Sequence, residues 1–141
     1  MQIIELLDKN TKTPTAMDHK EHFMNMFKKF LPIAMHYIEL DSLPEMDFQM
    51  QVTDTEQPTF GRYDNSERKL TVALMNRHPN DILRTLAHEL VHYKQDTEHQ
   101  LNPDSGETGS PEENQAHQIA GIVMRHFNKK YPEFLNSKPI T

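Results

Sequence analysis

Cysteine is absent from this chain of 141 residues. Without cysteine there can be no disulfide framework and no thiolate-ligated metal site, which excludes zinc fingers and zinc ribbons. A transition metal in this protein must therefore be held by histidine and carboxylate side chains. Both are plentiful, because the sequence contains 9 histidines and 21 aspartates and glutamates.

Long apolar segments are also missing. No run approaches the roughly 18 residues that a helix needs to cross a bilayer, so we expect no membrane partner. The N-terminal sequence MQIIELLDKN has a short apolar run followed by acids, which is unlike the core of a secretory signal. On these grounds we expect a cytoplasmic protein.

Positive charge is scarce as well. The formal net charge is -6, and the Lys-Lys pairs at 28–29 and 129–130 are too short to form a nucleic-acid-binding surface. We therefore expect no nucleic-acid partner. The chain length and the hydrophobic content of 35% fit a single domain, residues 1–141, with one modest core.

The N-terminal region, residues 1–45, has a helical pattern. Its first 16 residues are ambiguous, but from Met17 the apolar residues recur at spacings of three and four. Pro32 interrupts this pattern, because proline lacks the N–H that a helix interior needs. We therefore expect N-terminal helices, the second being either a separate short helix or a kinked continuation of the first.

Residues 46–76 change to a period of two, which indicates strands. Three strands are predicted, near residues 48–52, 60–63 and 70–75. A polar turn at 64–67 separates the last two. Short polar connections favour antiparallel pairing, so we expect a small, mainly antiparallel three-stranded sheet and an α+β fold. An extended substrate could add to the strand at 70–75, which precedes the next helix.

Residues 79–96 form the most strongly periodic helix. Pro79 marks its start, and Asn80 or Asp81 is the expected cap. A polar loop at 97–110 follows.

A second long helix is expected at 111–131. Ser110 and the residues after it have the arrangement of a capping box. Ala116, Ala120 and Gly121 are small and lie along one face, so the two long helices can approach closely.

The sequence HELVH at 88–92 lies in the first of these long helices. Residues four apart share a helix face, so His88 and His92 can bind one metal ion together. Glu89 lies roughly 100° further round the axis, where it can reach a water on the metal rather than the metal itself. The alternative is that both histidines are simply solvated on an amphipathic helix.

A catalytic zinc site needs a third protein ligand and an open position. Glu113, in the first turn of the second long helix, is our first choice for this ligand. It could instead serve only the capping box of Ser110, and the neighbouring Glu112 is a further candidate for the ligand. Glu98 and His99 follow the motif more closely and are weaker alternatives.

Metallopeptidases commonly add a side-chain donor that stabilises the oxyanion. Tyr63, Tyr93 and His117 are candidates for this role or for supporting a metal ligand. Each has an alternative role as an ordinary packing residue, and the sequence does not choose among them.

The run from Pro79 to Phe127, with RTLAHELVHYKQ and GSPEENQAHQIAGIVMRHF, resembles small gluzincin-like HEXXH metallopeptidases encoded by tailed bacteriophages. The resemblance implies a minimal zincin fold in which a following long helix supplies the glutamate ligand. It implies one Zn²⁺ on His88, His92 and Glu113, with Glu89 as the catalytic residue. The expected substrate is a protein or peptide, and the expected compartment is the host cytoplasm.

The leading hypothesis is thus a zinc metallopeptidase in which Glu89 is the general base. One alternative is a catalytically silent, zinc-stabilised binding or regulatory protein. Another is hydrolysis of an amide that is not a peptide.

Overall fold

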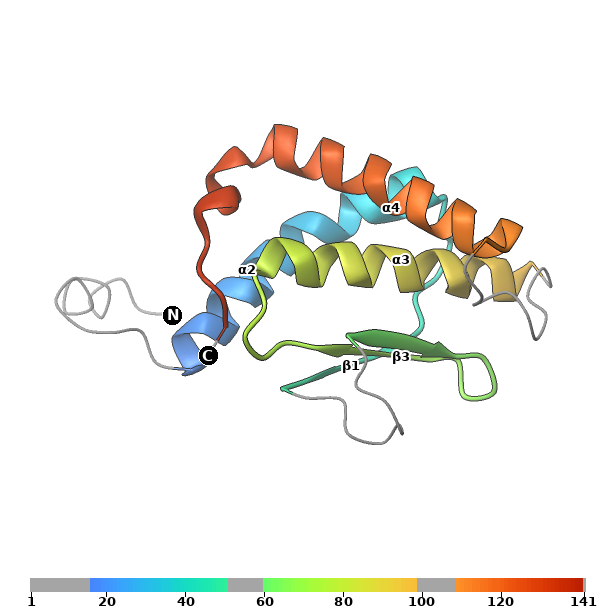
Figure 1. Cartoon of the computed structure of the whole chain (residues 1–141), viewed down its shortest axis with the longest axis horizontal. Coiled ribbons are helices and arrows are strands. Elements are labelled where there is room, and N and C mark those ends of the chain that lie inside the picture. The colour runs from blue at the N-terminus through green and yellow to red at the C-terminus, as the bar shows by residue number, and fades with distance from the viewer. Residues whose placement is uncertain (1–15, 51–59, 99–108, 141) are drawn as a thin grey trace, which may run out of the picture.

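The computed structural model describes residues 16–50, 60–98 and 109–140. The fold is α+β, with three α-helices on one side of a small sheet (Figure 1). No helix in these ranges is long and apolar enough to cross a membrane. In chain order the elements are α2 (Ala16–Ile38), β1 (Glu45–Gln49), β2 (Gly61–Asp64), β3 (Lys69–Ala73), α3 (Pro79–Thr97), α4 (Pro111–Lys130) and the 3₁₀-helix η1 (Pro132–Asn136).

The three strands form a mixed sheet in the order β1-β3-β2, so the prediction of a mainly antiparallel sheet is wrong. β3 pairs antiparallel with β2 but parallel with β1. The hairpin follows from the predicted polar turn, where Asp64 accepts hydrogen bonds from the N–H groups of Ser66 and Glu67. No tight turn joins β1 to β3. The rule that short connections give antiparallel pairs therefore does not fix the direction of β1 relative to β3.

β3 is buried on both faces because it is the central strand. Leu70 and Val72 are fully buried, and Thr71 and Ala73 on the opposite face are nearly so. The predicted alternation of buried and exposed positions therefore does not hold there. The first predicted strand is shifted towards the N-terminus, and its last residues lie outside the described part of the chain.

Helix α2 passes through Pro32 without ending, so the N-terminal pattern forms one helix rather than two. Proline fixes a helical φ, and the cost of the missing N–H is confined to one hydrogen bond of a long element. The apolar stripe continues across it, with Phe23, Met26 and Phe30 fully buried. The ambiguous residues 1–15 lie outside the described ranges.

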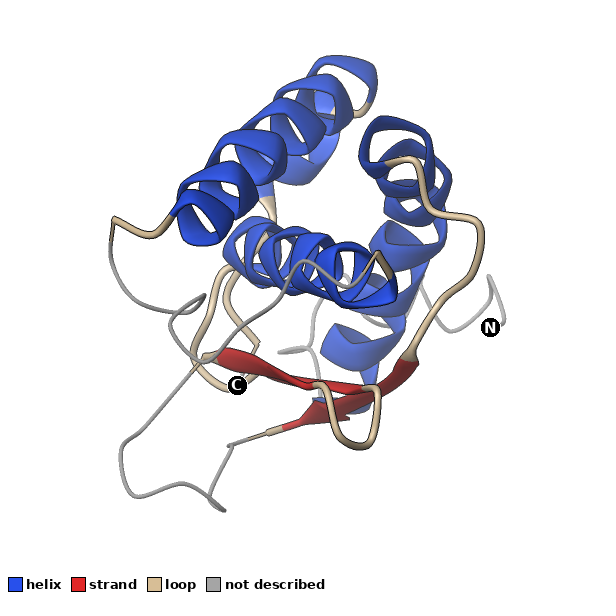
Figure 2. Cartoon of the chain, turned by 90° about the vertical axis from the view of Figure 1, so that its right-hand side faces the viewer, coloured by secondary structure: helices blue, strands red, loops and turns tan. Residues whose placement is uncertain are grey.

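Helix α3 lies directly over the sheet, with α4 and α2 packed on its other sides (Figure 2). Its apolar stripe is fully buried and joins the same core as side chains of α2, β3 and α4. This stripe consists of Ile82, Leu83, Leu86 and Leu90.

The helix start at Pro79 is confirmed, but its cap is neither Asn80 nor Asp81. The cap is His78, whose Nδ1 accepts a hydrogen bond of 3.0 Å from the N–H of Asn80. Proline suits the first helical position because its φ is preset and its missing N–H would have no helical partner there. The cap therefore falls on the residue before it.

Helix α4 begins as predicted, with Ser110 as the cap and Pro111 as the first helical residue. Ala116 and Ala120 are buried against the rest of the core. Gly121 does not share this role, because a Cβ there would meet no atom within 4 Å. The close approach of α3 and α4 therefore depends on the two alanines.

We expect Pro32→Ala to stabilise the protein by about 2 kcal/mol, because it restores one helical hydrogen bond at an exposed position. Urea unfolding followed by circular dichroism measures this change. The matched control is Pro132→Ala at the first position of η1, where proline has no such cost and the substitution should change stability by far less. Equal effects at both positions would contradict this account of Pro32.

Candidate metal centre

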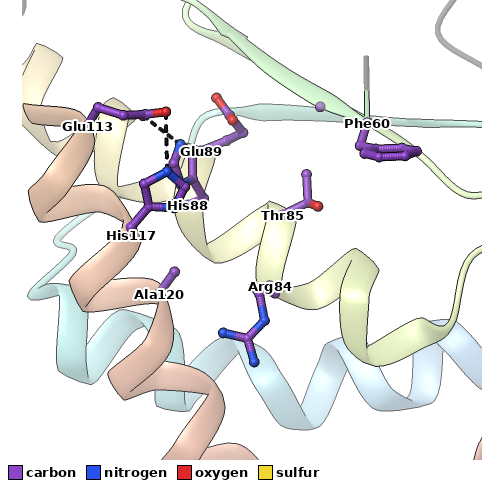
Figure 3. Close-up of a pocket in the computed structure, with 9 residues that line it drawn as sticks. Phe60, Arg84, Thr85, His88, Glu89, Glu113, His117 and Ala120 are labelled. Atoms are coloured by element: carbon purple, nitrogen blue, oxygen red, sulfur yellow. Dashed lines mark ion pairs between the residues drawn. The ribbon is translucent and has the colours of Figure 1, made fainter. Parts of the chain in front are cut away.

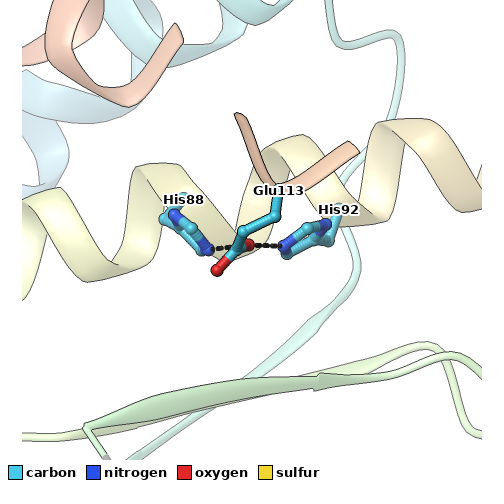
Figure 4. A group of neighbouring side chains, drawn as sticks. All are labelled: His88, His92 and Glu113. Atoms are coloured by element: carbon cyan, nitrogen blue, oxygen red, sulfur yellow. Dashed lines mark hydrogen bonds and ion pairs between the residues drawn. The ribbon is translucent and has the colours of Figure 1, made fainter. Parts of the chain in front are cut away.

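Three side chains that the sequence singled out converge between α3 and α4 (Figure 4). Nε2 of His88 lies 2.8 Å from Oε1 of Glu113, and Nε2 of His92 lies 2.9 Å from the same oxygen. One ligand atom from each of the three residues lies within 4.8 Å of the others. The exposed fractions of the side chains are 15%, 10% and 17%, so the group is largely shielded yet reachable. This His-His-Glu group could hold a metal ion.

The start of α4 places Glu113 at this group. The hydroxyl of Ser110 accepts a hydrogen bond of 3.1 Å from the backbone N–H of Glu113, which fixes the first turn. The carboxylate of Glu113 extends from that turn to the two imidazoles. Cap and ligand are therefore not exclusive roles, because the cap uses the backbone of this residue while its side chain faces the histidines.

The other candidates for the third ligand lie elsewhere. Glu112 meets α3 through its backbone, since its carbonyl accepts a hydrogen bond from Gln95. Glu98 is substantially exposed and lies 3.8 Å from Lys94 in an ion pair. His99 falls outside the described residues.

Gln95 is a residue of this centre that the sequence analysis missed. It is only 1% exposed, and its Oε1 lies 2.8 Å from Nδ1 of His92. Its Nε2 donates to the carbonyl of Glu112 and to Oε1 of Gln115, so the amide has no donor left for His92. Nδ1 of His92 must therefore be the donor, which leaves Nε2 of a neutral ring as an acceptor.

This tautomer makes the group suited to a cation. Nε2 of neutral His92 presents a lone pair to a carboxylate oxygen of Glu113 at 2.9 Å. Two lone pairs at that distance repel unless a proton or a metal ion lies between them. Ligand atoms around tetrahedral zinc are ~3.4 Å apart, and the ligand atoms here all lie within 4.8 Å of one another, so small side-chain adjustments would admit the ion. Two imidazoles and a carboxylate, without cysteine, form a donor set that suits zinc.

Burial also shifts the pKa values of His88 and Glu89. Desolvation lowers the pKa of His88, and the nearby His92 and His117 act in the same direction, against Glu113. A lowered pKa favours the neutral ring that a metal requires. Desolvation likewise raises the pKa of Glu89 to about 7, although the backbone N–H of Tyr63 donates to it.

A pocket of about 320 Å³ opens beside the three ligands (Figure 3). Helix α3 contributes two pairs of residues spaced four apart, Arg84 with His88 and Thr85 with Glu89. The other walls come from Phe60 and Gly61 at the start of β2 and from Glu113, His117 and Ala120 on α4. Glu89 thus shares one solvent-accessible space with two of the metal-ligand candidates.

The structure separates the three oxyanion candidates. His117 lines the pocket, is 68% exposed, and its Nε2 lies 3.4 Å from Oε2 of Glu113. The hydroxyl of Tyr63 donates to Asp96 at 2.5 Å, and that of Tyr93 shares a hydrogen bond of 2.6 Å with Ser42. Neither tyrosine is among the residues that line the pocket. The part of Tyr63 that meets the site is its backbone N–H, which sequence patterns do not reveal.

The strand beside the pocket is β2, not β3. β3 is paired along both edges, so the expectation that a substrate strand adds to it is wrong. β2 approaches α3 closely because Gly61 has no side chain. A Cβ at this position would lie 2.5 Å from Cγ2 of Thr85 and 3.7 Å from Cγ of Glu89.

Arg77 fixes this approach from the other side. Its guanidinium donates to the carbonyls of Phe60, Ala73 and Asp81 and to the hydroxyl of Thr85. One side chain therefore ties the entrance of β2, the end of β3 and the first turns of α3 together. The wall of the pocket that faces Glu89 is set by these bonds.

We expect Gly61→Ala to destabilise the protein by about 1 to 3 kcal/mol, because the new methyl group overlaps the methyl group of Thr85. Thr85→Ser removes that methyl group and keeps the hydroxyl bonded to Arg77. The double variant should therefore recover most of the lost stability in a double-mutant cycle measured by urea unfolding. Additive effects of the two substitutions would show that the contact is not the cause.

We expect Gln95→Leu to weaken the binding of a metal ion at this group, measured with zinc as the probe, about tenfold to a hundredfold, because His92 loses the acceptor that fixes its tautomer. Competition against a chromophoric zinc chelator measures the change. Gln115→Ala is the matched control, since Gln115 is exposed and contacts Gln95 rather than the histidine. An unchanged zinc affinity in Gln95→Leu would refute this role.

No protein-family model matches the chain, and no match was found among the curated proteins or among the solved structures. The relation to phage metallopeptidases therefore stays a prediction based on the two sequence segments that suggested it. The structure shows an α+β fold with a His-His-Glu group that could bind a metal ion.

Proposed function

We propose that this protein is a zinc metallopeptidase with a minimal zincin-like fold, related to the small phage enzymes that its sequence resembles. The observation that carries the proposal is the convergence of His88, His92 and Glu113 beside a pocket that Glu89 also lines. A metal site with a purely structural role needs no acid-base group and no open space next to it. This centre has both.

His88, His92 and Glu113 would hold the ion. When bound, zinc would make a water molecule more acidic and stabilise negative charge on the carbonyl oxygen of the substrate. Three protein ligands leave room for water and substrate, and the pocket provides that room on one side of the ligands.

Glu89 is suited to transfer the proton. Its carboxylate lies one residue from His88 and about a quarter of a turn round the helix, so it can reach a water molecule in the pocket. In its ionised form it can accept a proton as the water oxygen bonds to the carbonyl carbon. The same proton then passes to the amide nitrogen as the carbon–nitrogen bond breaks. The N–H of Tyr63 holds the carboxylate in place meanwhile.

His117 is the best placed of the oxyanion candidates. Its ring lies 4.5 Å from the ring of His88 between centroids and borders the pocket. An imidazole N–H there could donate to the oxygen that gains negative charge during the reaction. The tyrosine hydroxyls are already bonded to Asp96 and Ser42, which favours His117 over both.

We expect one zinc per chain in the native protein and a large loss of zinc in Glu113→Ala. Glu112→Ala and Gln115→Ala are matched controls on the same helix turn and should keep the metal. Metal analysis of the purified variants makes this comparison. A full zinc complement in Glu113→Ala would refute the ligand set.

The same preparations test hydrolysis. Incubation with a peptide library and mass spectrometry of new termini should reveal cleavage that chelation abolishes. Glu89→Gln should keep its zinc and lose cleavage by about a hundredfold or more, because it cannot accept the proton. Zinc binding without any cleavage would refute the peptidase and favour the silent binding protein. Equal cleavage by the native protein and Glu89→Gln would refute the role of the glutamate.

A further inference from the structure

One side chain in the pocket has no part in the chemistry proposed above. Arg84 lies on α3 one turn before His88 and lines the pocket (Figure 3). It forms no hydrogen bond and no ion pair with any residue in the described ranges. Arginine is the residue best suited to bind a carboxylate, since its planar guanidinium offers paired donors.

The position of Arg84 fits a group next to the cleaved bond. Four residues of helix rise about 6 Å, which is close to the length of two residues of a bent peptide or of one residue with its side chain. The side chains of Arg84 and His88 share a face of α3, and Ala120 on α4 leaves space beside them. A substrate whose carbonyl sits at the metal ligands would therefore reach Arg84 with a neighbouring group.

The side chain of Arg84 is exposed, and no carboxylate of the described residues pairs with it. Arg84 is the residue among those lining the pocket that carries a permanent positive charge. A bound anionic group would supply its missing partner.

Arg77, the other arginine near the pocket, has a different role. Its N–H groups are committed to three backbone carbonyls and to Thr85. Its guanidinium lies 4.4 Å from the centroid of the Phe60 ring and supports that ring. Phe60 remains 65% exposed and provides an apolar surface on the opposite wall from Arg84. The pocket thus offers one free cation and one aromatic face.

We propose that Arg84 binds a carboxylate of the substrate and makes the enzyme selective for peptides that carry a carboxylate close to the cleaved bond. This inference rests on the proposed peptidase function. The carboxylate has two possible sources, the side chain of an aspartate or glutamate next to the cleaved bond and the C-terminal carboxylate of a short peptide. Both present the same group to Arg84, with the intervening methylene or backbone atoms against Phe60.

The test compares the zinc-loaded native chain with Arg84→Gln and Arg84→Glu on two libraries of randomised synthetic peptides. One library is acetylated and amidated, and the other has free C-terminal carboxylates. Mass spectrometry identifies the residues that flank each cleaved bond. Arg125→Gln is the matched control, because it removes the same charge from an exposed site on α4 outside the pocket. The zinc content of each variant checks that the centre is intact.

We expect acidic residues beside the cleaved bond to be enriched up to about fivefold for the native chain, the upper end for an exposed ion pair. Arg84→Gln should lose this enrichment, Arg84→Glu should favour basic residues, and Arg125→Gln should match the native chain. Enrichment in the amidated library identifies the side chain as the source. Cleavage confined to the ends of free-acid peptides identifies the terminal carboxylate. Identical preferences in the native chain and Arg84→Gln would overturn the inference while leaving the peptidase in place.

A binding measurement separates the inference from the proposed function. Zinc-loaded Glu89→Gln is titrated with two fluorescent peptides of glycine and alanine, one with a central glutamate and one with a central glutamine, and anisotropy is recorded. The glutamate peptide should bind about fivefold more tightly, and Arg84→Gln in the same background should remove the difference. If no library is cleaved but this difference appears, hydrolysis fails and the anion site stands. Equal binding of both peptides overturns the anion site for side-chain carboxylates. The same pair with free C-termini then tests the terminal carboxylate, and tighter binding than that of the blocked peptides supports it.

Discussion

The contact between the first turn of α4 and the middle of α3 is the constraint on which the rest of the site depends. It places the carboxylate of Glu113 against two imidazoles that belong to another helix. Leu86 and Leu90 on α3 and Ala116 and Ala120 on α4 are buried in the common core that holds the helices together. Because packed cores deform little, the positions of the polar side chains on the same two helices are fixed as well. A metal site built this way needs no rigid loop.

A second contact, between β2 and α3, controls Glu89. Gly61 lets the strand lie against the helix, and Arg77 fastens the start of the strand to Thr85. The carboxylate of Glu89 is therefore enclosed between strand and helix, and its desolvation raises its pKa to about 7. The raised pKa of Glu89 is thus a consequence of how strand and helix pack. Glycine at position 61 shapes the surroundings of Glu89 without presenting any functional group.

Sequence patterns predicted those parts of the site that depend on local helix geometry. His88 and His92 share a helix face because helical spacing is fixed, and the capping box identified the turn that carries Glu113. Whether that carboxylate would serve the cap or the metal could not be decided locally, because the answer depends on where α3 lies. Gln95 could have been predicted from one feature. It is a polar residue three positions after His92, and it lies on a helix that packs on both sides.

Non-local features were beyond the same reasoning. The direction of β1 depends on which edge of β3 it joins, and no short turn encodes that choice. The N–H of Tyr63 meets Glu89 only because β2 lies at the edge of the sheet, and backbone groups leave no mark in a sequence. A side-chain role was predicted for this tyrosine, whereas its hydroxyl is bonded to Asp96.

Metal binding and folding are coupled in such an arrangement. The two histidines and the glutamate come from different helices, so an ion bound to all three would cross-link α3 and α4 near the start of α4. Without a cation, the lone pair of His92 and the Glu113 carboxylate repel each other across the same interface, unless a proton lies between them. Zinc would therefore stabilise the folded chain as well as activate water, and a ligand that binds only the folded state shifts the folding equilibrium in proportion to its affinity. The packing of α4 against α3 would therefore set both the stability of this helix pair and the affinity of the His-His-Glu group for a metal ion.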